Sequence, residues 1–270
     1  MNELHRKKER LEEILREARS VLVAFSGGVD STFLLKAARD VLGGNVLAVT
    51  ASSEIYPPGE AEEAASLARL LGVEHIEVRT RGLKSPAFAG NPPDRCYLCK
   101  KEIYTELWAL AGQRGLACVI DGVNADDAGD YRPGIRAGVE LGVRSPLREA
   151  GLTKEDIRAL SRAAGLPTAG KPANPCLASR FPYGSEITVD ALRQVALAED
   201  YLRSAGLPEV RVRHHGNLAR IEVPGEYLQF VAGRAEEISA RLKGIGYTYV
   251  ALDLQGYRTG AMNETLARRR

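Results

Sequence analysis

Residues 26–31 read Ser-Gly-Gly-Val-Asp-Ser, a composition that suits a loop for binding phosphate. They follow the apolar run 21–25 and precede a helical pattern over 32–41, so the glycines would stand at a helix N-terminus. Unpaired amides and the helix dipole favour an anion there, and glycine lets the backbone approach it closely. Asp30 would repel a bare phosphate, which indicates a bridging cation such as Mg²⁺.

Two better known nucleotide-binding patterns do not fit this loop. A Walker loop ends in Gly-Lys-Ser or Gly-Lys-Thr, but no lysine follows Gly27 and Gly28. A dinucleotide fingerprint needs a third glycine, which is also missing. The loop resembles instead the pyrophosphate loop (PP-loop) of the N-type ATP pyrophosphatases, which cleave ATP to AMP and pyrophosphate. That resemblance implies ATP and Mg²⁺ as cofactors.

Cysteines offer a second kind of chemistry. Cys96 and Cys99 form a Cys-x-x-Cys pair at the start of a predicted helix, and Cys176 follows in the segment Asn-Pro-Cys-Leu-Ala-Ser-Arg. A helix N-terminus lowers the pKa of a thiol, which favours ligation or reactivity. Cys118 lies within an apolar strand and is interpreted as part of the core. Without a secretory signal, such cysteines serve as metal ligands, catalytic groups or buried thiols more often than as disulfides.

The three remaining thiols leave several kinds of site open. A structural zinc needs a fourth ligand, for which His214 and His215 are candidates. A cubane iron–sulfur cluster with one labile iron needs only three thiolates. A persulfide relay between cysteines needs no metal at all. The residues alone do not separate these possibilities.

Strand and helix patterns alternate through the first part of the chain, which predicts an α/β fold with a parallel, doubly wound sheet. Ligands of such sheets bind at the carboxyl ends of the strands. Along this rim, Asn124, Asp126 and Asp127 suit nucleotide or metal contacts as well as a solvated Asx turn. The predicted strands span 20–25, 45–51, 73–79 and 117–121, and the predicted helices span 3–19, 31–42, 59–71 and 97–114. The candidate nucleotide-binding residues are Ala24, Ser26, Gly27, Gly28, Asp30, Ser31, Thr50, Gly122, Asn124 and Asp126.

The rest of the chain has a different pattern. We expect irregular structure over 130–150, a helix that Thr153 caps and that ends near Ala164, and an ordered loop over 168–186. The order that follows, α-β-β-α-β, is typical of a small α+β domain of antiparallel character. Its elements are a helix over 189–204, strands over 209–214 and 218–223, a helix over 225–243 and a strand over 247–252. We therefore predict an ATP pyrophosphatase domain, 1–185, and a smaller domain, 186–270, for substrate binding or oligomerisation.

The composition restricts the class of function. Of the 270 residues, 44% are hydrophobic and 27% are charged, as in ordinary soluble globular proteins. A net charge of +2 argues against a strongly electrostatic nucleic-acid partner. No apolar run is long enough to span a membrane, and no secretory signal is evident. The sequence therefore predicts a cytoplasmic protein with neither a nucleic-acid nor a membrane partner.

Four further motifs occur in order along the chain. They read Gly-Val-Asn-Ala-Asp-Asp, Arg-Pro-Gly-Ile-Arg-Ala, Ser-Pro-Leu-Arg-Glu-Ala-Gly-Leu-Thr-Lys and Lys-Pro-Ala-x-x-Cys-Leu-Ala-Ser-Arg. Together with the PP-loop they resemble the LarE family over about residues 3–255. Members of that family are ATP-dependent sulfur transferases that help to make the nickel-pincer cofactor of lactate racemase.

The resemblance implies a reaction and its participants. The substrate would be pyridinium-3,5-biscarboxylic acid mononucleotide, whose carboxylate is adenylated and then converted to a thiocarboxylate with sulfide or another sulfur donor. In the family a cysteine at the position of Cys176 supplies sulfur, in some members sacrificially, whereas three-cysteine members bind a cluster. Cys96, Cys99 and Cys176 are all present, so we expect them to hold a [4Fe–4S] cluster. The family also implies a homo-oligomer.

Arginines are the candidates for binding this anionic substrate, because the planar guanidinium grips carboxylates and phosphates bidentately. Arg211 and Arg213 alternate on a strand and share one face, which could also be an exposed basic surface. Glu199 resembles an acid near the family's active site and equally fits a solvated helix residue. The substrate-binding candidates are Ser179, Arg180, Arg211 and Arg213, and the catalytic candidates are Cys176, Asp30, Ser179, Arg180 and Glu199.

Three other functions use parts of this pattern. A tRNA thiolase shares the ATP loop and often has paired cysteines, but the near-neutral charge and the lack of an evident RNA-binding module argue against it. A glutamine- or ammonia-dependent amidoligase of the same superfamily would not need three cysteines. A non-catalytic nucleotide or iron–sulfur sensor would have no reason for the arginines.

Overall fold

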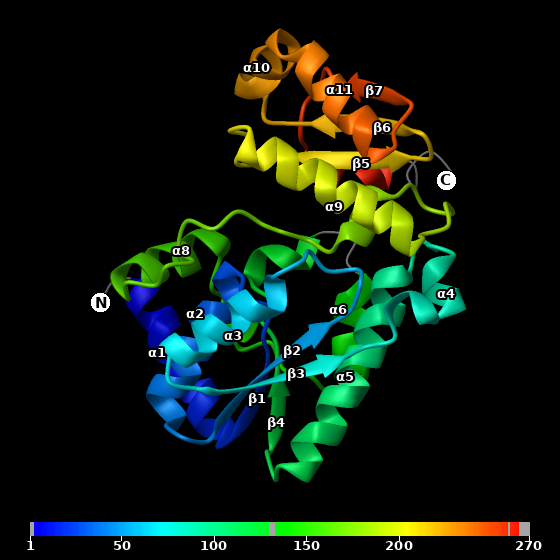
Figure 1. Ribbon diagram of the computed structural model, residues 1–270. Helices are drawn as coiled ribbons and strands as arrows, with labels where there is room; N and C mark the ends of the chain where they lie inside the picture. Colours follow the sequence, from blue (N-terminus) through cyan, green and yellow to red (C-terminus); the bar gives the residue numbers. More distant parts are fainter. Residues whose placement is uncertain (1–2, 130–132, 259, 265–270) are drawn as a thin grey trace. The chain divides into compact units, whose positions relative to one another are not determined.

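The computed structural model describes residues 3–129, 133–258 and 260–264, and its contacts divide the chain into two compact units (Figure 1). Unit 1 comprises residues up to 53, 58–81 and 94–174, and unit 2 comprises 54–57, 82–93 and the residues from 175 on. The predicted boundary lies near Ser185, whereas the contacts divide the chain after Asn174. They also join two earlier segments to the C-terminal part. A segment that packs against a distant part of the chain carries no local signal of doing so.

Among its described residues, unit 1 is built on a four-stranded parallel sheet with the order β3-β2-β1-β4, in agreement with the predicted α/β fold. The strands are β1 (Val21–Ala24), β2 (Val46–Ser52), β3 (Glu74–Arg79) and β4 (Cys118–Ile120). Val21 pairs with Val46 on one side and with Cys118 on the other. Because the chain passes from β1 to β2 while β4 borders the other edge of β1, the strand order reverses between β1 and β4. Sheets of this kind bind ligands at the carboxyl end of that point.

Helices cover both faces of this sheet, which explains why its inner strands are almost wholly apolar. The helical elements of unit 1 are α1 (Glu3–Ala18), α2 (Val29–Leu42), α3 (Glu60–Leu70), α5 (Arg95–Gln113), η2 (Ala125–Gly129), α6 (Pro133–Glu140), α7 (Pro146–Glu149) and α8 (Lys154–Ala163). Val21 and Val23 belong to a core cluster with α1, α2, α3 and α8. Leu22 belongs to a second cluster with α5 and α6, so alternate residues of β1 face opposite layers.

The expectation of irregular structure over 130–150 was wrong, because α6 and α7 lie in the described part of that segment; residues 130–132 are outside it. Each of these helices begins with a proline, Pro133 or Pro146. Proline suits the first turn, where its missing amide would have had no partner anyway. The capping box predicted at Thr153 is confirmed, with Asp156 bonding back to it.

Unit 2 contains, among its described residues, a three-stranded sheet in the order β5-β6-β7. The elements of unit 2 are η1 (Gly82–Lys84), α4 (Pro86–Ala89), η3 (Leu177–Arg180), α9 (Val189–Ser204), β5 (Arg211–His215), β6 (Leu218–Glu222), η4 (Gly225–Tyr227), α10 (Leu228–Gly233), α11 (Ala235–Ile245), β7 (Tyr249–Leu252) and η5 (Ala261–Asn263). β5 and β6 are antiparallel as predicted, but β6 and β7 are parallel, so the expected antiparallel character holds only in part. The helices between β6 and β7 make the connection long enough for a parallel crossover. The helix expected over 225–243 is interrupted at Arg234. No described helix is long and apolar enough to cross a membrane.

Candidate active site

The PP-loop joins β1 to α2 and leaves the start of that helix open. Gly28 is the N-cap residue, and no side chain of the described residues caps it. Gly27 has a φ of +66°, a left-handed conformation that glycine adopts without strain. Ser31 Oγ lies 3.1 Å from Ser26 Oγ and accepts a hydrogen bond from Ser26 N at 3.3 Å, so these side chains close the loop on itself. The first amides of α2 therefore remain available to an anion.

The end of β4 lies directly against this helix N-terminus. A Cβ on Gly122 would stand only 3.0 Å from Ser31 N, so a larger residue would push the two segments apart. Asp121 is buried and accepts hydrogen bonds from Tyr104 Oη at 2.7 Å and from Ser145 Oγ at 2.8 Å. The loop and the end of β4 together form the edge at which the strand order reverses.

Asn124 and Asp126 form an Asx turn beside this edge. Asn124 Oδ1 accepts from Asp126 N at 2.9 Å, and Asp126 Oδ2 accepts from Lys154 N at 2.8 Å. Asn124 is buried, so the solvated turn considered as an alternative is wrong for this residue, although the turn itself is present. The contribution of both side chains to nucleotide binding stays a prediction.

The two carboxylate oxygens of Asp30, in the first turn of α2, have different surroundings. Oδ2 accepts a hydrogen bond from Lys154 Nζ at 2.5 Å. Oδ1 is buried, and no described residue bonds to it. A buried carboxylate oxygen needs a partner, and Mg²⁺ prefers such hard oxygen ligands. Asp30 therefore fits the magnesium ligand that the sequence predicted, and the role itself stays a prediction.

Two lysines at this loop were missed by the sequence analysis. Lys154 contacts Asp30, and Lys171 Nζ donates to the carbonyl oxygen of Gly27 at 3.1 Å. Both lysines lie in the quoted motifs, as the last residue of Ser-Pro-Leu-Arg-Glu-Ala-Gly-Leu-Thr-Lys and the first of Lys-Pro-Ala-x-x-Cys-Leu-Ala-Ser-Arg. Their positions in those motifs were the available signal.

Thr50, predicted as a nucleotide contact, uses its hydroxyl within the sheet. Oγ1 donates to the carbonyl oxygen of Phe25 at 2.8 Å and lies 2.8 Å from His75 Nε2. Because the single hydroxyl proton goes to Phe25, His75 Nε2 is the donor in the second contact. Burial lowers the pKa of His75. Thr50 therefore connects β2 to β3 and to the end of β1 at the rim of the sheet. Ala24, at the end of β1, packs against the core cluster that includes α5, and its nucleotide contact stays a prediction.

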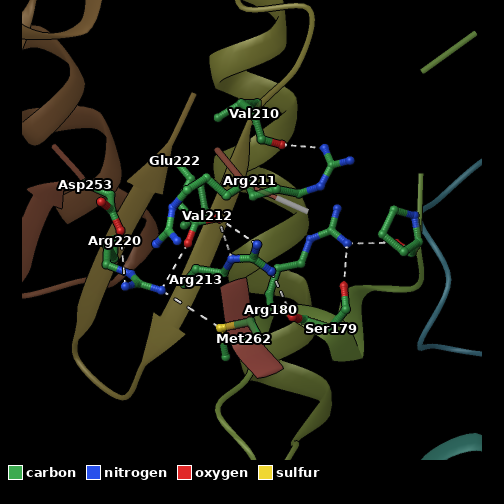
Figure 2. A network of polar contacts seen from close by, with 12 residues as sticks. Ser179, Arg180, Val210, Arg211, Val212, Arg213, Arg220, Glu222, Asp253 and Met262 are labelled. Carbon is green, nitrogen blue, oxygen red and sulfur yellow. Dashed lines mark hydrogen bonds and ion pairs between the residues drawn. The ribbon is translucent and has the colours of Figure 1, made fainter. Parts of the chain in front are cut away.

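The fully buried Arg180 holds the residues around Cys176, and Figure 2 shows its contact with Ser179. Arg180 Nη1 donates to the carbonyl oxygens of Pro175 at 2.7 Å and of Cys176 at 3.2 Å, and to Ser179 Oγ at 2.8 Å. Its Nε and Nη2 bind the two carboxylate oxygens of Glu199 at 2.8 and 2.9 Å. Arg180 thus connects the backbone of Pro175 and Cys176 to helix α9.

Glu199 is fully buried, so its alternative interpretation as a solvated helix residue is wrong. It also accepts hydrogen bonds from Arg203 Nη2 at 2.7 Å and from Val212 N at 3.0 Å. Burial alone raises the pKa of Glu199, but the hydrogen bonds and charge of Arg180, with those other donors, outweigh burial and hold the pKa below its ordinary value. Glu199 is therefore a carboxylate that stays ionised in the core of unit 2.

Arg211 and Arg213 lie on β5 as predicted, but both are buried, so the alternative of an exposed basic strand is wrong. Arg213 binds Glu222 Oε2 through Nε at 2.8 Å and Nη2 at 2.6 Å, and its Nη1 donates to the carbonyl oxygen of Ser179 at 3.0 Å. Figure 2 shows Arg213 and Arg220 converging on Glu222.

Arg211 has a different environment from Arg213. Its Nη1 donates to the carbonyl oxygen of Val210 at 2.8 Å, and its guanidinium lies 5.1 Å from the ring centroid of Tyr257. Burial and the charge of Arg180 lower the pKa of Arg211. Substrate binding by these arginines and by Ser179 stays a prediction.

No disulfide joins the cysteines among the described residues, and all but Cys118 are partly exposed. Cys96 and Cys99 lie at the start of α5 in unit 1, and Cys176 lies in unit 2. Within the described ranges, no three His, Cys, Asp or Glu side chains are gathered as metal ligands. The cluster therefore remains a prediction, supported by the donor chemistry of three partly exposed thiols.

Cys118 and the histidine pair fit structural roles. Cys118 is buried, as predicted, and burial raises the pKa of its thiol. His214, considered as a zinc ligand, packs its ring on Phe181 at 4.9 Å between centroids. Its Nδ1 lies 3.2 Å from Tyr247 Oη. Burial lowers the pKa of the half-buried His214, whereas His215 is exposed.

Comparison with known proteins gives near-complete matches. The chain is 44% identical to pyridinium-3,5-bisthiocarboxylic acid mononucleotide synthase of Lactiplantibacillus plantarum, over 99% of this chain and 98% of that protein. It is 47% identical to an uncharacterised protein of Synechocystis sp., over 98% of this chain and 100% of that protein. It is 26% identical to a glutamine-hydrolysing GMP synthase of Pyrobaculum aerophilum, over 77% of this chain but only 46% of that protein. No family model matches the chain.

Proposed function

We propose that this chain, which belongs to the LarE family of ATP-dependent sulfur transferases, converts a carboxylate of pyridinium-3,5-biscarboxylic acid mononucleotide to a thiocarboxylate. Identity to a pyridinium-3,5-bisthiocarboxylic acid mononucleotide synthase along nearly all of both chains supports the product and a place in nickel-pincer cofactor biosynthesis. The structural observation that carries the proposal is the open N-terminus of α2 where the strand order reverses, with Asp30 in its first turn. Substrate binding in unit 2, a homo-oligomer and a cytoplasmic location accompany the proposal as predictions.

The first step activates the substrate. A carboxylate is a poor electrophile because its leaving group would be oxide. A carboxylate oxygen attacks the α-phosphorus of ATP, which forms an acyl-adenylate and releases pyrophosphate. The amides at the start of α2 and the ammonium of Lys154 would bind phosphate oxygens during this step. Mg²⁺ held by Asp30 would offset the negative charge on those oxygens.

The second step forms the carbon–sulfur bond. Sulfide attacks the carbonyl carbon of the acyl-adenylate, AMP leaves with the electron pair of the broken C–O bond, and a proton is released from sulfur. A [4Fe–4S] cluster held by Cys96, Cys99 and Cys176 would supply that sulfide. In the sacrificial alternative, the Cys176 thiolate attacks the same carbon and displaces AMP. Loss of the Cα proton and cleavage of the Cβ–S bond then leave dehydroalanine in the protein and release the thiocarboxylate.

The buried charges of unit 2 suggest where the anionic substrate binds. Three arginines and two glutamates are buried among the described residues of this unit: Arg180, Arg211, Arg213, Glu199 and Glu222. A guanidinium group binds a phosphate or a carboxylate with charge-assisted hydrogen bonds. We therefore propose that the substrate is bound by the predicted residues Ser179, Arg180, Arg211 and Arg213, of which Arg180 and Arg213 are also held by Glu199 and Glu222.

Anaerobic incubation with the biscarboxylate mononucleotide, ATP, Mg²⁺ and sulfide tests the function. We expect AMP, pyrophosphate and thiocarboxylate to form in equal amounts. Asp30→Asn should abolish pyrophosphate release in a folded protein, because the cation loses its ligand. Lys36→Met, which breaks an exposed pair with Asp40 on α2, should leave release unchanged. AMP formation that depends on ammonia would favour the amidoligase, and thiolation of tRNA would favour the tRNA thiolase.

Turnover and protein mass distinguish the two sulfur sources. With a cluster, several thiocarboxylates form per polypeptide, the protein mass is unchanged, and alanine at any of the three cysteines removes most of the iron. With sacrificial chemistry, only Cys176→Ala abolishes transfer, and turnover stops at one. The spent protein then becomes lighter by the mass of hydrogen sulfide. That mass loss in a fully iron-loaded sample would contradict the cluster proposal.

A further inference from the structure

Lys171 contacts the PP-loop in a way that the reaction above does not use. Its Nζ donates to the carbonyl oxygen of Gly27 at 3.1 Å and to Glu63 Oε1 at 2.6 Å. Gly27 is the left-handed residue of the loop, and Glu63 lies in the first turn of α3. An ammonium group is therefore held beside the phosphate loop by the loop itself and by one neighbouring acid.

The backbone that carries this ammonium group is fixed by α8. Arg158 of this helix donates through Nη1 to the carbonyl oxygen of Ala169 and through Nη2 to that of Lys171, both at 3.1 Å. Lys171 N donates to the carbonyl oxygen of Thr168 at 2.9 Å. Only the flexible four-carbon stem of the lysine is then left to adjust. The same helix begins with Lys154, so α8 positions one lysine at Asp30 and the other at Gly27.

The contact between Lys171 and Glu63 is easily exchanged. The Glu63 side chain is 52% exposed, and exposed ion pairs contribute little because water screens them. A triphosphate at the start of α2 carries more negative charge than Glu63 and forms stronger charge-assisted hydrogen bonds. The nucleotide would therefore compete successfully with Glu63 for the ammonium group.

We propose that Lys171 is a further phosphate-binding residue of the ATP site and that Glu63 holds its ammonium group until nucleotide binds. The proposal rests on the proposed function only in taking ATP as the ligand of the loop. Lys171 differs in this respect from Lys154, whose partner is the expected magnesium ligand Asp30. Lys154 keeps its partner Asp30 while it binds phosphate oxygens, whereas Lys171 exchanges a protein carboxylate for the phosphates.

Calorimetric titration of the full-length enzyme with MgATP, without the carboxylate substrate, tests this exchange. Lys171→Met should raise the Kd for ATP about 10-fold or more, because a charge-assisted hydrogen bond contributes about 1.5–3 kcal/mol. Lys171→Arg keeps the charge and should recover most of that loss. Glu63→Gln should lower the Kd by up to about 5-fold, because it removes a competitor that is weakly paired with the lysine. Lys36→Met, on α2 and paired with Asp40, controls for the change in net charge.

The double variant Lys171→Met with Glu63→Gln decides whether the two residues act together. If Glu63 acts through Lys171, the glutamine substitution has no effect once the lysine is gone. Additive effects would mean that Glu63 repels the phosphates directly, which would overturn the proposed exchange. Unchanged ATP affinity in Lys171→Met, with wild-type ATP cleavage intact, would remove Lys171 from the site and leave the proposed function standing. Failure of the wild type to bind or cleave ATP would refute the proposed function instead.

Discussion

Replacing Glu199 by Gln should destabilise the protein because it removes one charge of a buried ion pair and keeps the shape of the side chain. Glu199 accepts hydrogen bonds from Arg180, Arg203 and Val212 N, all between 2.7 and 3.0 Å. In the variant, the amide nitrogen would face a guanidinium nitrogen, donor against donor, where neither Arg180 nor residue 199 reaches solvent. Arg180 would then be a buried cation without a charged partner.

The size of the effect follows from that uncompensated charge. Removing one partner of a buried ion pair typically costs about 3–5 kcal/mol. The glutamine oxygen still accepts one hydrogen bond, so we expect the lower end of that range, about 3 kcal/mol. A whole domain is stable by only about 5–15 kcal/mol, so the loss should be plain. Arg203→Met removes a partner that is 31% exposed and also binds Asp200, and it should cost no more than about 1 kcal/mol.

The effect should also depend on pH with a definite sign. The pKa of Glu199 is lowered in the folded protein, so its contribution is complete above the unfolded pKa, about 4.3, and is lost as the pH falls through the folded value. The difference in unfolding free energy between wild type and Glu199→Gln should therefore be constant above about pH 5 and should narrow below about pH 4.

Urea unfolding at a series of pH values, followed by circular dichroism, measures both effects. The double variant Arg180→Met with Glu199→Met is the matched control, because apolar replacement of both partners is often neutral or stabilising. It should be more stable than Glu199→Gln, yet its Cys176 should react faster with iodoacetamide because Pro175 and Cys176 lose their donor. A loss under about 1 kcal/mol in Glu199→Gln, or a difference that persists in acid, would refute the reasoning.

Two smaller predictions concern the backbone of unit 1. Gly27→Ala should lower the unfolding free energy by about 1–2 kcal/mol and weaken ATP binding, because Gly27 has a φ of +66°. Gly28→Ala is the control, because Gly28 has an ordinary φ of −81°. Equal losses in the two variants by urea unfolding would argue against backbone strain. Thr153→Ala should cost about 1 kcal/mol through loss of the capping box of α8, and a thermal midpoint equal to that of wild type would contradict this.

Local patterns predicted the sheet of unit 1 well. Strands β1, β2 and β4 are short, mostly apolar runs, and β3 alternates polar with apolar residues. Such periodicity and the glycine pair are both properties of neighbouring residues. The pairing of β6 with β7 could not be predicted in this way. It depends on how α10 and α11 return the chain, and strand direction leaves no trace in the strand's own residues. The sequence also did not indicate that residues 54–57 and 82–93 pack with the C-terminal part of the chain, because those contacts are made with residues far away in the sequence.

The sequence indicated which residues belong to the candidate site, but it did not indicate which of them are buried or which groups they contact. Arg211 and Arg213 alternate with apolar neighbours, a pattern that normally means an exposed strand face. Their burial depends on carboxylates that other elements supply, such as Glu222 on β6 for Arg213. Glu199 likewise has the sequence context of an ordinary helix surface, because no residue near it in the sequence indicates its ion pair with Arg180. Charge pairs between distant segments are therefore the part of this site that a single sequence conceals.

The irregular backbone before Cys176 explains why the ion pairs of Arg180 and Arg213 are buried. Pro172 and Pro175 lack amide hydrogens and interrupt regular structure before Cys176, so this part of the backbone lacks the regular hydrogen bonds of a helix or a sheet. Arg180 donates to the carbonyl oxygens of Pro175 and Cys176, the second of which also accepts from Ser179 N, and Arg213 donates to that of Ser179. A buried guanidinium in turn requires a carboxylate, which Glu199 and Glu222 supply. The ion pairs of unit 2 thus hold an irregular segment in one conformation, as a reactive or metal-binding thiol at Cys176 would require.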